Sequence, residues 1–173
     1  MTLSACGAHQ GAGGSERAVF TVGNGYFQEG PSPAGRLVDL QVPPLHNQSG
    51  STVRLSSVQL VDPPAGVRLV SVTAYPFQQV GVGVTLGAWG DLPKLCPKEY
   101  IPYPVTAAVT AARSDSDWIV MLAVDVPKLG RYHFGRVRID YIANGKPGWQ
   151  YQNLDIIIDM MPPTATWPDK DPC

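Results

Sequence analysis

Glycine and proline interrupt this chain so often that long helices cannot form. The 173 residues include 18 glycines and 17 prolines, about a fifth of the chain. Proline breaks a helix because it lacks an amide donor and clashes with the preceding turn, and glycine costs a helix conformational entropy. A chain punctuated in this way is typical of many short strands joined by turns.

Between these interruptions, apolar and polar residues alternate at the two-residue period of a half-buried strand. In the segment 52–61 the alternation changes phase, which predicts a bulge near Ser56 and Ser57. Trp118–Val126 is almost continuously apolar and is expected to be the most buried strand. The predicted strands are 17–22, 36–42, 52–61, 67–75, 80–86, 105–112 (a short helix being the alternative), 118–126, 131–142 and a last one around 154–160.

About nine strands at this spacing predict an all-β fold, a two-sheet antiparallel β-sandwich with a long proline-rich loop over 87–104. Loops are also expected over 30–35 and from the Asn144-Gly145 turn to Gln150. Residues 1–16 are rich in Gly, Ala and Ser without apolar periodicity, so they are interpreted as a flexible tether. Residues 17–173 then form a single domain.

One short run resembles a known type of sandwich. Gly130-Arg131-Tyr132-His133-Phe134 is similar to the Gly/Ala-x-Tyr-x-Cys run that enters the sixth strand of immunoglobulin-like and fibronectin type III-like domains. The resemblance covers about 118–160, and it implies an immunoglobulin-like fold in which Tyr132 bonds back to the backbone. Phe134 stands in place of the Cys, which removes the inter-sheet disulfide, and the resemblance carries over no catalytic residue.

The N-terminus also carries a suggestive pattern. Leu3-Ser4-Ala5-Cys6 resembles the bacterial lipobox, and this resemblance implies that Cys6 is lipidated. The five residues before Cys6 are fewer than the apolar region of a secretion signal, so the alternative is a tail with an incidental thiol. No apolar stretch reaches the 18 residues of a transmembrane helix, and membrane contact is expected only through the lipid.

The two remaining cysteines, Cys96 and Cys173, are expected to form a disulfide, with two free thiols as the alternative. In the chain-entropy model, closing the loop from Cys96 to Cys173 stabilises a fold by roughly 4.5 kcal/mol. Because disulfides persist in oxidising compartments, we expect an extracytoplasmic protein, secreted or held at the cell membrane by a lipid anchor.

Several function classes have little support in the sequence. The balance of 13 Lys and Arg against 14 Asp and Glu disfavours nucleic acid as a partner. No Gly-x-Ser-x-Gly elbow, phosphate loop or metal-ligand cluster is present, so we expect no catalytic residues, metal or cofactor. Asp155 and Asp159 lie four residues apart on one strand, about 13 Å, which is too far for a glycosidase pair. They are interpreted as solvated positions, as are Arg136 and Arg138.

Aromatic residues in or beside predicted loops are the suggestive group for binding. They are Trp89, Tyr100, Tyr103, Trp149 and Tyr151. Such rings recognise proteins or carbohydrates, or they cap the ends of the sandwich. The leading hypothesis is a non-enzymatic module for a protein partner at the cell surface or for envelope assembly, and the alternative is a carbohydrate-binding module. Asn47-Gln48-Ser49 also fits a glycosylation sequon.

The cysteine predictions can be tested by the intact mass of protein purified from its native host. We expect a diacylglycerol on Cys6 and a mass deficit of two hydrogen atoms that reductant reverses, as a Cys96–Cys173 disulfide requires. Three alkylatable thiols on an unmodified chain would contradict both the lipid and the disulfide.

Overall fold

Strands make up most of the chain that the computed structural model describes, residues 14–22, 28–35, 37–77 and 101–162. Within these ranges the helical residues are Phe77 and the 3-10 turn η1 (Val105–Ala107), and no helix is long and apolar enough to cross a membrane. The all-β prediction is confirmed. The strands are β1 (Ser15–Glu16), β2 (Gln28–Pro33), β3 (Leu37–Gln41), β4 (His46–Asn47), β5 (Val53–Val61), β6 (Arg68–Pro76), β7 (Tyr103–Pro104), β8 (Val109–Thr110), β9 (Ser114–Asp115), β10 (Trp118–Asp125), β11 (Gly130–Ala143) and β12 (Lys146–Met161).

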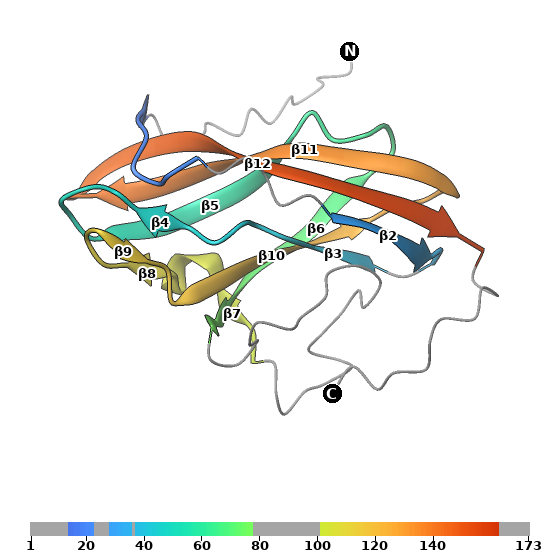
Figure 1. Cartoon of the computed structure of the whole chain (residues 1–173), viewed down its shortest axis with the longest axis horizontal. Coiled ribbons are helices and arrows are strands. Elements are labelled where there is room, and N and C mark those ends of the chain that lie inside the picture. The colour runs from blue at the N-terminus through green and yellow to red at the C-terminus, as the bar shows by residue number, and fades with distance from the viewer. Residues whose placement is uncertain (1–13, 23–27, 36, 78–100, 163–173) are drawn as a thin grey trace, which may run out of the picture.

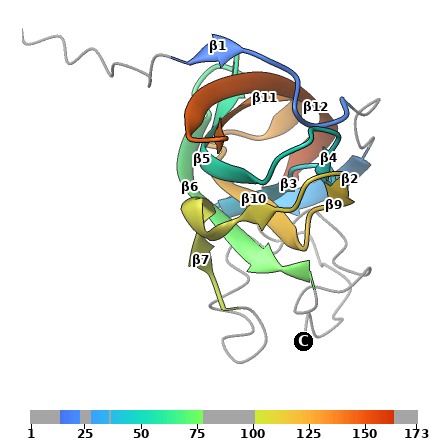
Figure 2. The same cartoon turned by 90° about the vertical axis from the view of Figure 1, so that its left-hand side faces the viewer.

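Two main sheets face one another (Figure 1 and Figure 2). The larger has the order β1-β12-β11-β5-β8, with β2 also beside β12, and the smaller has the order β3-β10-β6-β7. β4 and β9 form a separate pair. The larger sheet is mixed, because β1 and β2 both run parallel to β12. The prediction of purely antiparallel sheets is therefore wrong at this edge, where the long β12 accepts two short segments from the N-terminal part of the chain.

The core lies between these two sheets and follows from the alternation in their strands. Each strand sends every second side chain inward, so one apolar cluster joins both sheets. Its fully buried members include Val38, Leu40, Leu122, Val124, Val137, Ile139, Leu154 and Ile156. β10 pairs with β3 on one side and β6 on the other, and residues 119–124 are buried without a break. This confirms that it is a central strand.

The predicted bulge in β5 is also confirmed. Asp140 pairs with Ser57 and Tyr141 pairs with Leu55, which leaves Ser56 without a partner across the ladder. The extra residue restores the phase, so that Val53 and Leu55 before it and Val58 after it all reach the core.

Several segments differ from their predicted form. Residues 30–35, expected to be a loop, contain most of β2, whose prolines are tolerated because it lies at a sheet edge. In 17–22, expected to be a strand, only Phe20 forms an isolated bridge, while Ser15 and Glu16 of the predicted tether pair with β12. Residues 105–112 form η1 and the short β8 instead of one strand. The predicted strand 80–86 and most of the loop 87–104 lie outside the described residues, and Tyr103–Pro104 forms β7.

The last strand begins earlier than the sequence predicts. β12 starts at Lys146, directly after Asn144 and Gly145, both of which have positive φ. This is the conformation of a tight hairpin turn. Gly148 is needed in β12 because a Cβ there would lie 2.7 Å from the ring and hydroxyl of Tyr141. Pro147 and Gly148 look like loop residues in isolation, which explains why the strand was predicted to start later.

The N-terminal segment is held against this hairpin by buried polar groups. The Tyr141 hydroxyl donates to the carbonyl of Arg17. The side-chain oxygen of Gln150 accepts hydrogen bonds of 2.8 Å from the amides of Val19 and Phe20. Burial raises the pKa of the Tyr141 hydroxyl, and the positive charge of Arg17 offsets part of that rise. The segment thus closes one edge of the sandwich through its backbone.

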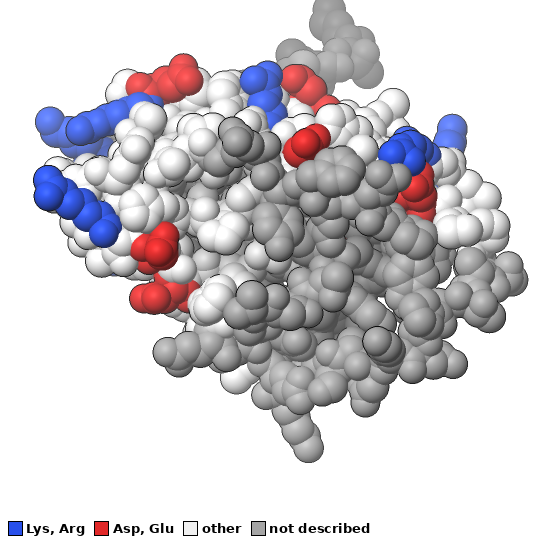
Figure 3. Space-filling view, viewed as in Figure 1, with Lys and Arg blue, Asp and Glu red and all other residues white. Residues whose placement is uncertain are grey.

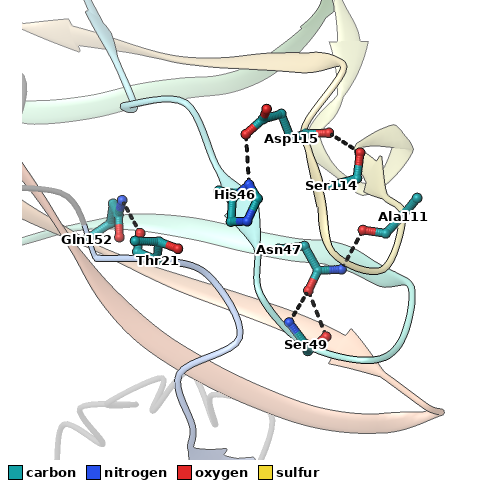
Figure 4. A network of polar contacts seen from close by, with 8 residues as sticks. All are labelled: Thr21, His46, Asn47, Ser49, Ala111, Ser114, Asp115 and Gln152. Atoms are coloured by element: carbon teal, nitrogen blue, oxygen red, sulfur yellow. Dashed lines mark hydrogen bonds and ion pairs between the residues drawn. The ribbon is translucent and has the colours of Figure 1, made fainter.

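Asn47 holds a second junction, shown in Figure 4. Its side-chain nitrogen donates to the carbonyls of Ser51, Thr110 and Ala111 at 2.8, 3.2 and 2.8 Å. Its side-chain oxygen accepts from the amide and hydroxyl of Ser49. Asn47 is fully buried, so the sequon serves a structural purpose and offers no glycan acceptor in the folded chain.

We expect Tyr141→Phe to lower the free energy of unfolding at pH 7 by about 1 kcal/mol, the usual contribution of one hydrogen bond. The Tyr141 pKa is raised in the fold above its ordinary value of 10.0, so folding favours the neutral phenol. That contribution is complete below pH 10 and is lost as pH rises through the folded-state pKa. Urea unfolding between pH 7 and 11 tests this, with the exposed Tyr103→Phe as control. Equal alkaline destabilisation of Tyr141→Phe and the wild type would contradict it.

We expect Asn47→Asp to lower the free energy of unfolding by roughly 3 kcal/mol, because a buried carboxylate would then face three carbonyl oxygens. The neighbouring exposed Gln48→Glu is the matched control and should change stability by less than about 0.5 kcal/mol. Chemical denaturation of both variants measures the difference. Similar unfolding midpoints for the two would show that the Asn47 contacts contribute little.

Candidate functional site

Five of the predicted site residues lie outside the residues that the structure describes: Cys6, Trp89, Cys96, Tyr100 and Cys173. The lipid anchor, the disulfide and part of the aromatic group therefore stay predictions. Tyr103, Trp149 and Tyr151 are described. Tyr103 begins β7 and packs edge-to-face against Trp118, with 5.5 Å between the ring centroids.

Trp149 and Tyr151 lie on the outer face of the larger sheet, within β12 and away from its loops. They alternate with Gly148, Gln150 and Gln152, which are buried. Because neighbouring residues of a strand point to opposite faces, both rings point away from the core. Their centroids are 5.2 Å apart and the ring planes meet at 67°.

Two arginines of β11 cover these rings. The guanidinium of Arg136 lies 4.7 Å from the centre of the Tyr151 ring, and that of Arg138 lies 4.6 Å from the centre of the Trp149 ring. Each such cation–π contact stabilises an exposed site by about 0.5–1 kcal/mol. We name Arg136, Arg138, Trp149 and Tyr151 the arginine–aromatic strip.

The two arginines are held differently. Asp140 accepts hydrogen bonds from Arg138 at 2.9 and 2.7 Å and from the Ser57 hydroxyl at 2.6 Å. Asp140 is itself buried, so Arg138 is fixed over Trp149. Arg136 has a weaker ion pair, 3.7 Å from Asp62, and the Asp62 side chain is 89% exposed. A ligand can therefore bind Arg136 with little loss of energy, because the ion pair that Arg136 would give up is weak.

The surroundings of the strip are polar and carry further positive charge. Gln59 pairs with Arg138 across β5 and is exposed on the same face. Arg54, further along β5, is also exposed. A stacked guanidinium still presents N–H donors in a fork that matches a carboxylate, so the strip can bind a carboxylate beside an apolar ring.

The arginines of the strip were interpreted from the sequence as simply solvated, and their stacking was missed. The signal lies in the Asn144-Gly145 turn. A two-residue turn at that point places Arg138 opposite Tyr151 and Asp140 opposite Trp149, which is the pairing observed. Counting outward from the turn would have put the arginines beside the rings.

Two histidines pair with aspartates elsewhere on the surface. His46 Nδ1 lies 2.9 Å from Asp115, and His133 Nε2 lies 2.9 Å from Asp155. Asp155 has φ of +53° at the bulge that shifts the β11–β12 register, so the prediction of a regular strand fails there. Asp159 lies 3.4 Å from Arg131. No group of three or more His, Cys, Asp or Glu able to hold a metal occurs among the described residues.

Comparison with known proteins adds little to this geometry. No protein-family model and no curated protein matches the chain. Among solved structures, part of the VesB protease of Vibrio cholerae is distantly similar, with 12% sequence identity and a TM-score of 0.36. The match covers 82% of this chain and 32% of the protease chain, so this chain spans about a third of that protein.

Proposed function

We propose that this chain is a non-enzymatic binding module that recognises a protein partner outside the cytoplasm through the arginine–aromatic strip. The observation that carries the proposal is the stacking of Arg136 and Arg138 on Tyr151 and Trp149 on an open sheet face. Arginine and large aromatic residues dominate the binding energy of protein interfaces. Arg138 is already fixed by Asp140, so little conformational entropy is lost on binding.

We further propose that the fold is of the immunoglobulin-like type. In chain order, β3, β5, β6, β10, β11 and β12 correspond to strands B to G, and the sheets β3-β10-β6 and β5-β11-β12 reproduce the B-E-D and C-F-G orders. Tyr132 donates a 3.2 Å hydrogen bond to the carbonyl of Lys128, four residues upstream, as a tyrosine corner does. Phe134 is buried where the half-cystine would lie.

The location rests on the sequence. The lipobox-like Leu3-Ser4-Ala5-Cys6 and the Cys96–Cys173 pair both favour an extracytoplasmic, lipid-anchored or secreted protein. Under this proposal the lipid on Cys6 tethers the module to a cell membrane. Immunoglobulin-like sandwiches commonly serve as binding modules on cell surfaces.

A carbohydrate-binding module is the second candidate, favoured by the position of Trp149 and Tyr151 on one sheet face. Sugar rings stack best on flat, uncovered aromatic surfaces. Here the ring planes meet at 67° and arginines lie over both rings. The geometry therefore favours a protein partner with acidic side chains over a neutral glycan.

Site-specific photo-crosslinking in the native host tests the proposal. A photoreactive residue in place of Gln59, which lies beside the strip, is expected to form one prominent protein adduct. The matched control places the same residue at Gln48, which is also exposed but lies beside β4. Because the adduct depends on the arginines, the double variant Arg136→Ala, Arg138→Ala should reduce it by at least about tenfold, as loss of two interface hot-spot residues predicts.

Equal adducts at positions 59 and 48, or an adduct insensitive to the arginines, would refute the proposal. A glycan-array signal that is lost in Trp149→Ala and kept in the double arginine variant would favour the carbohydrate-binding alternative.

A further inference from the structure

A groove lies at the end of the smaller sheet, on a different part of the molecule from the strip. Its volume is about 480 Å³. Apolar side chains line most of it, namely Val42, Pro44, Phe77, Trp118 and Ile119. Val42 and Ile119 are buried, whereas Phe77 is 43% exposed. The groove thus has a fixed apolar floor and a ring that ligands can reach.

The fold forms this groove before any ligand arrives. β3 ends at Gln41, and the chain after it stays beside the start of β10: the Val42 amide donates to the Val120 carbonyl at 2.9 Å, and the Leu45 carbonyl accepts from the Ser116 amide at 2.8 Å. The Phe77 amide donates to the Asp117 carbonyl at 2.7 Å, and the Trp118 amide donates to the Ser116 hydroxyl at 3.1 Å. The edge-to-face contact of Tyr103 supports the Trp118 ring. Both aromatic walls are therefore held by their own backbones.

The rim of the groove is acidic. Asp115 and Asp117 both line it. The Asp115 side chain is 86% exposed, and its ion-pair partner among the described residues is His46, at 2.9 Å (Figure 4). Asp117 is exposed and forms no ion pair with the part of the chain that the structure describes. Figure 3 shows acidic side chains at the end of the molecule where β9 lies, with Lys and Arg side chains also present at that end. An anionic ligand would be repelled here.

We propose that this groove binds a lysine or arginine side chain presented by a protein partner. The long apolar stem of such a side chain would pack on Phe77 and Trp118, and its charged head would reach the two carboxylates. A cation above an indole ring gains a further cation–π attraction. A purely apolar side chain would fill the floor and leave the rim charges without a counter-ion. The groove is independent of the strip, because it is built from other strands and selects the opposite charge.

The test is a titration of the full chain with peptide, in which binding is measured from the NMR signal of the Trp118 indole N–H. The probe is the capped tripeptide Leu-Lys-Leu, and the matched control peptide is Leu-Glu-Leu. We expect the lysine peptide to bind with a Kd of about 1 mM, as suits an anchor of one side chain. Its Kd should be at least about fivefold lower than that of the glutamate peptide. Added salt should weaken it, because the rim carboxylates are exposed.

Single variants test whether Asp115 and Asp117 on the rim cause the preference for the lysine peptide. Asp115→Asn and Asp117→Asn should each weaken binding of the lysine peptide about two- to fivefold, the usual range for an exposed charge pair. Asp62→Asn, equally exposed but beside the strip, is the matched control and should leave binding unchanged. These three positions are exposed, and unchanged urea midpoints will show that each variant folds.

Equal binding of the two peptides would overturn the proposal, as would an unshifted Trp118 signal at about 10 mM peptide. An equal response of the Asp115, Asp117 and Asp62 variants would also overturn it. Because no strip residue is changed and no native partner is needed, failure here leaves the function proposed for the strip standing.

Discussion

The register of the β11–β12 hairpin determines the rest of this molecule. Asn144 and Gly145 both have positive φ, which gives a two-residue turn whose twist matches that of the flanking strands. From this turn the pairing runs outward to Gly130 and Met160. A slip by one residue would send Val137, Ile139 and Tyr141 to solvent and the arginines into the core. The core, the strip and the edge that accepts β1 and β2 all depend on this one turn.

The same hairpin also positions polar groups inside the sandwich. Gln150 and Gln152 point inward and bond to the backbone of residues 19–21. Buried amides cost free energy unless they are paired, so the N-terminal segment follows a course that pairs the Gln150 side chain and the side-chain nitrogen of Gln152, although the Gln152 side-chain oxygen has no hydrogen-bond partner among the described residues. Tyr141 adds a further bond to Arg17. Three polar side chains thus specify where an otherwise irregular segment lies.

The sequence predicts those parts of the fold that repeat every two residues. β3, β5, β6, β10 and β11 were predicted within a few residues of their observed bounds, including the bulge at Ser56, because alternation with one wet face is unambiguous. The predictions fail where pairing is imposed by a neighbouring strand. β2 is a strand although two of its six residues are prolines, because β12 supplies the partner. η1 forms where alanines weaken the preference for a strand.

The sequence predicted the aromatic residues of the candidate site but not the arginines that lie over them. Trp149 and Tyr151 were predicted as binding residues because they lie in or beside the loop expected to run to Gln150. What makes the site is the neighbouring strand: Arg136 and Arg138 are distant in sequence and are brought onto the rings by cross-strand pairing. Asp140, which looks like a third solvated residue in the same alternation, is buried and fixes Arg138. Single-sequence periodicity assigns a residue to a face, whereas neighbours on that face follow only from the register.

Under the two binding proposals, recognition by this molecule depends on local electrostatics. The net charge of −1 produces almost no long-range steering field, so a partner cannot be selected by overall charge. Basic residues around Arg136 and acidic residues around Asp117 instead occupy separate surfaces, and each combines its charge with aromatic rings. The rings give apolar contact that any partner could exploit, and the charges discriminate among partners. Under the two proposals, specificity comes from the charges that lie beside aromatic surfaces, because a mismatched partner would leave those charges unpaired and desolvated.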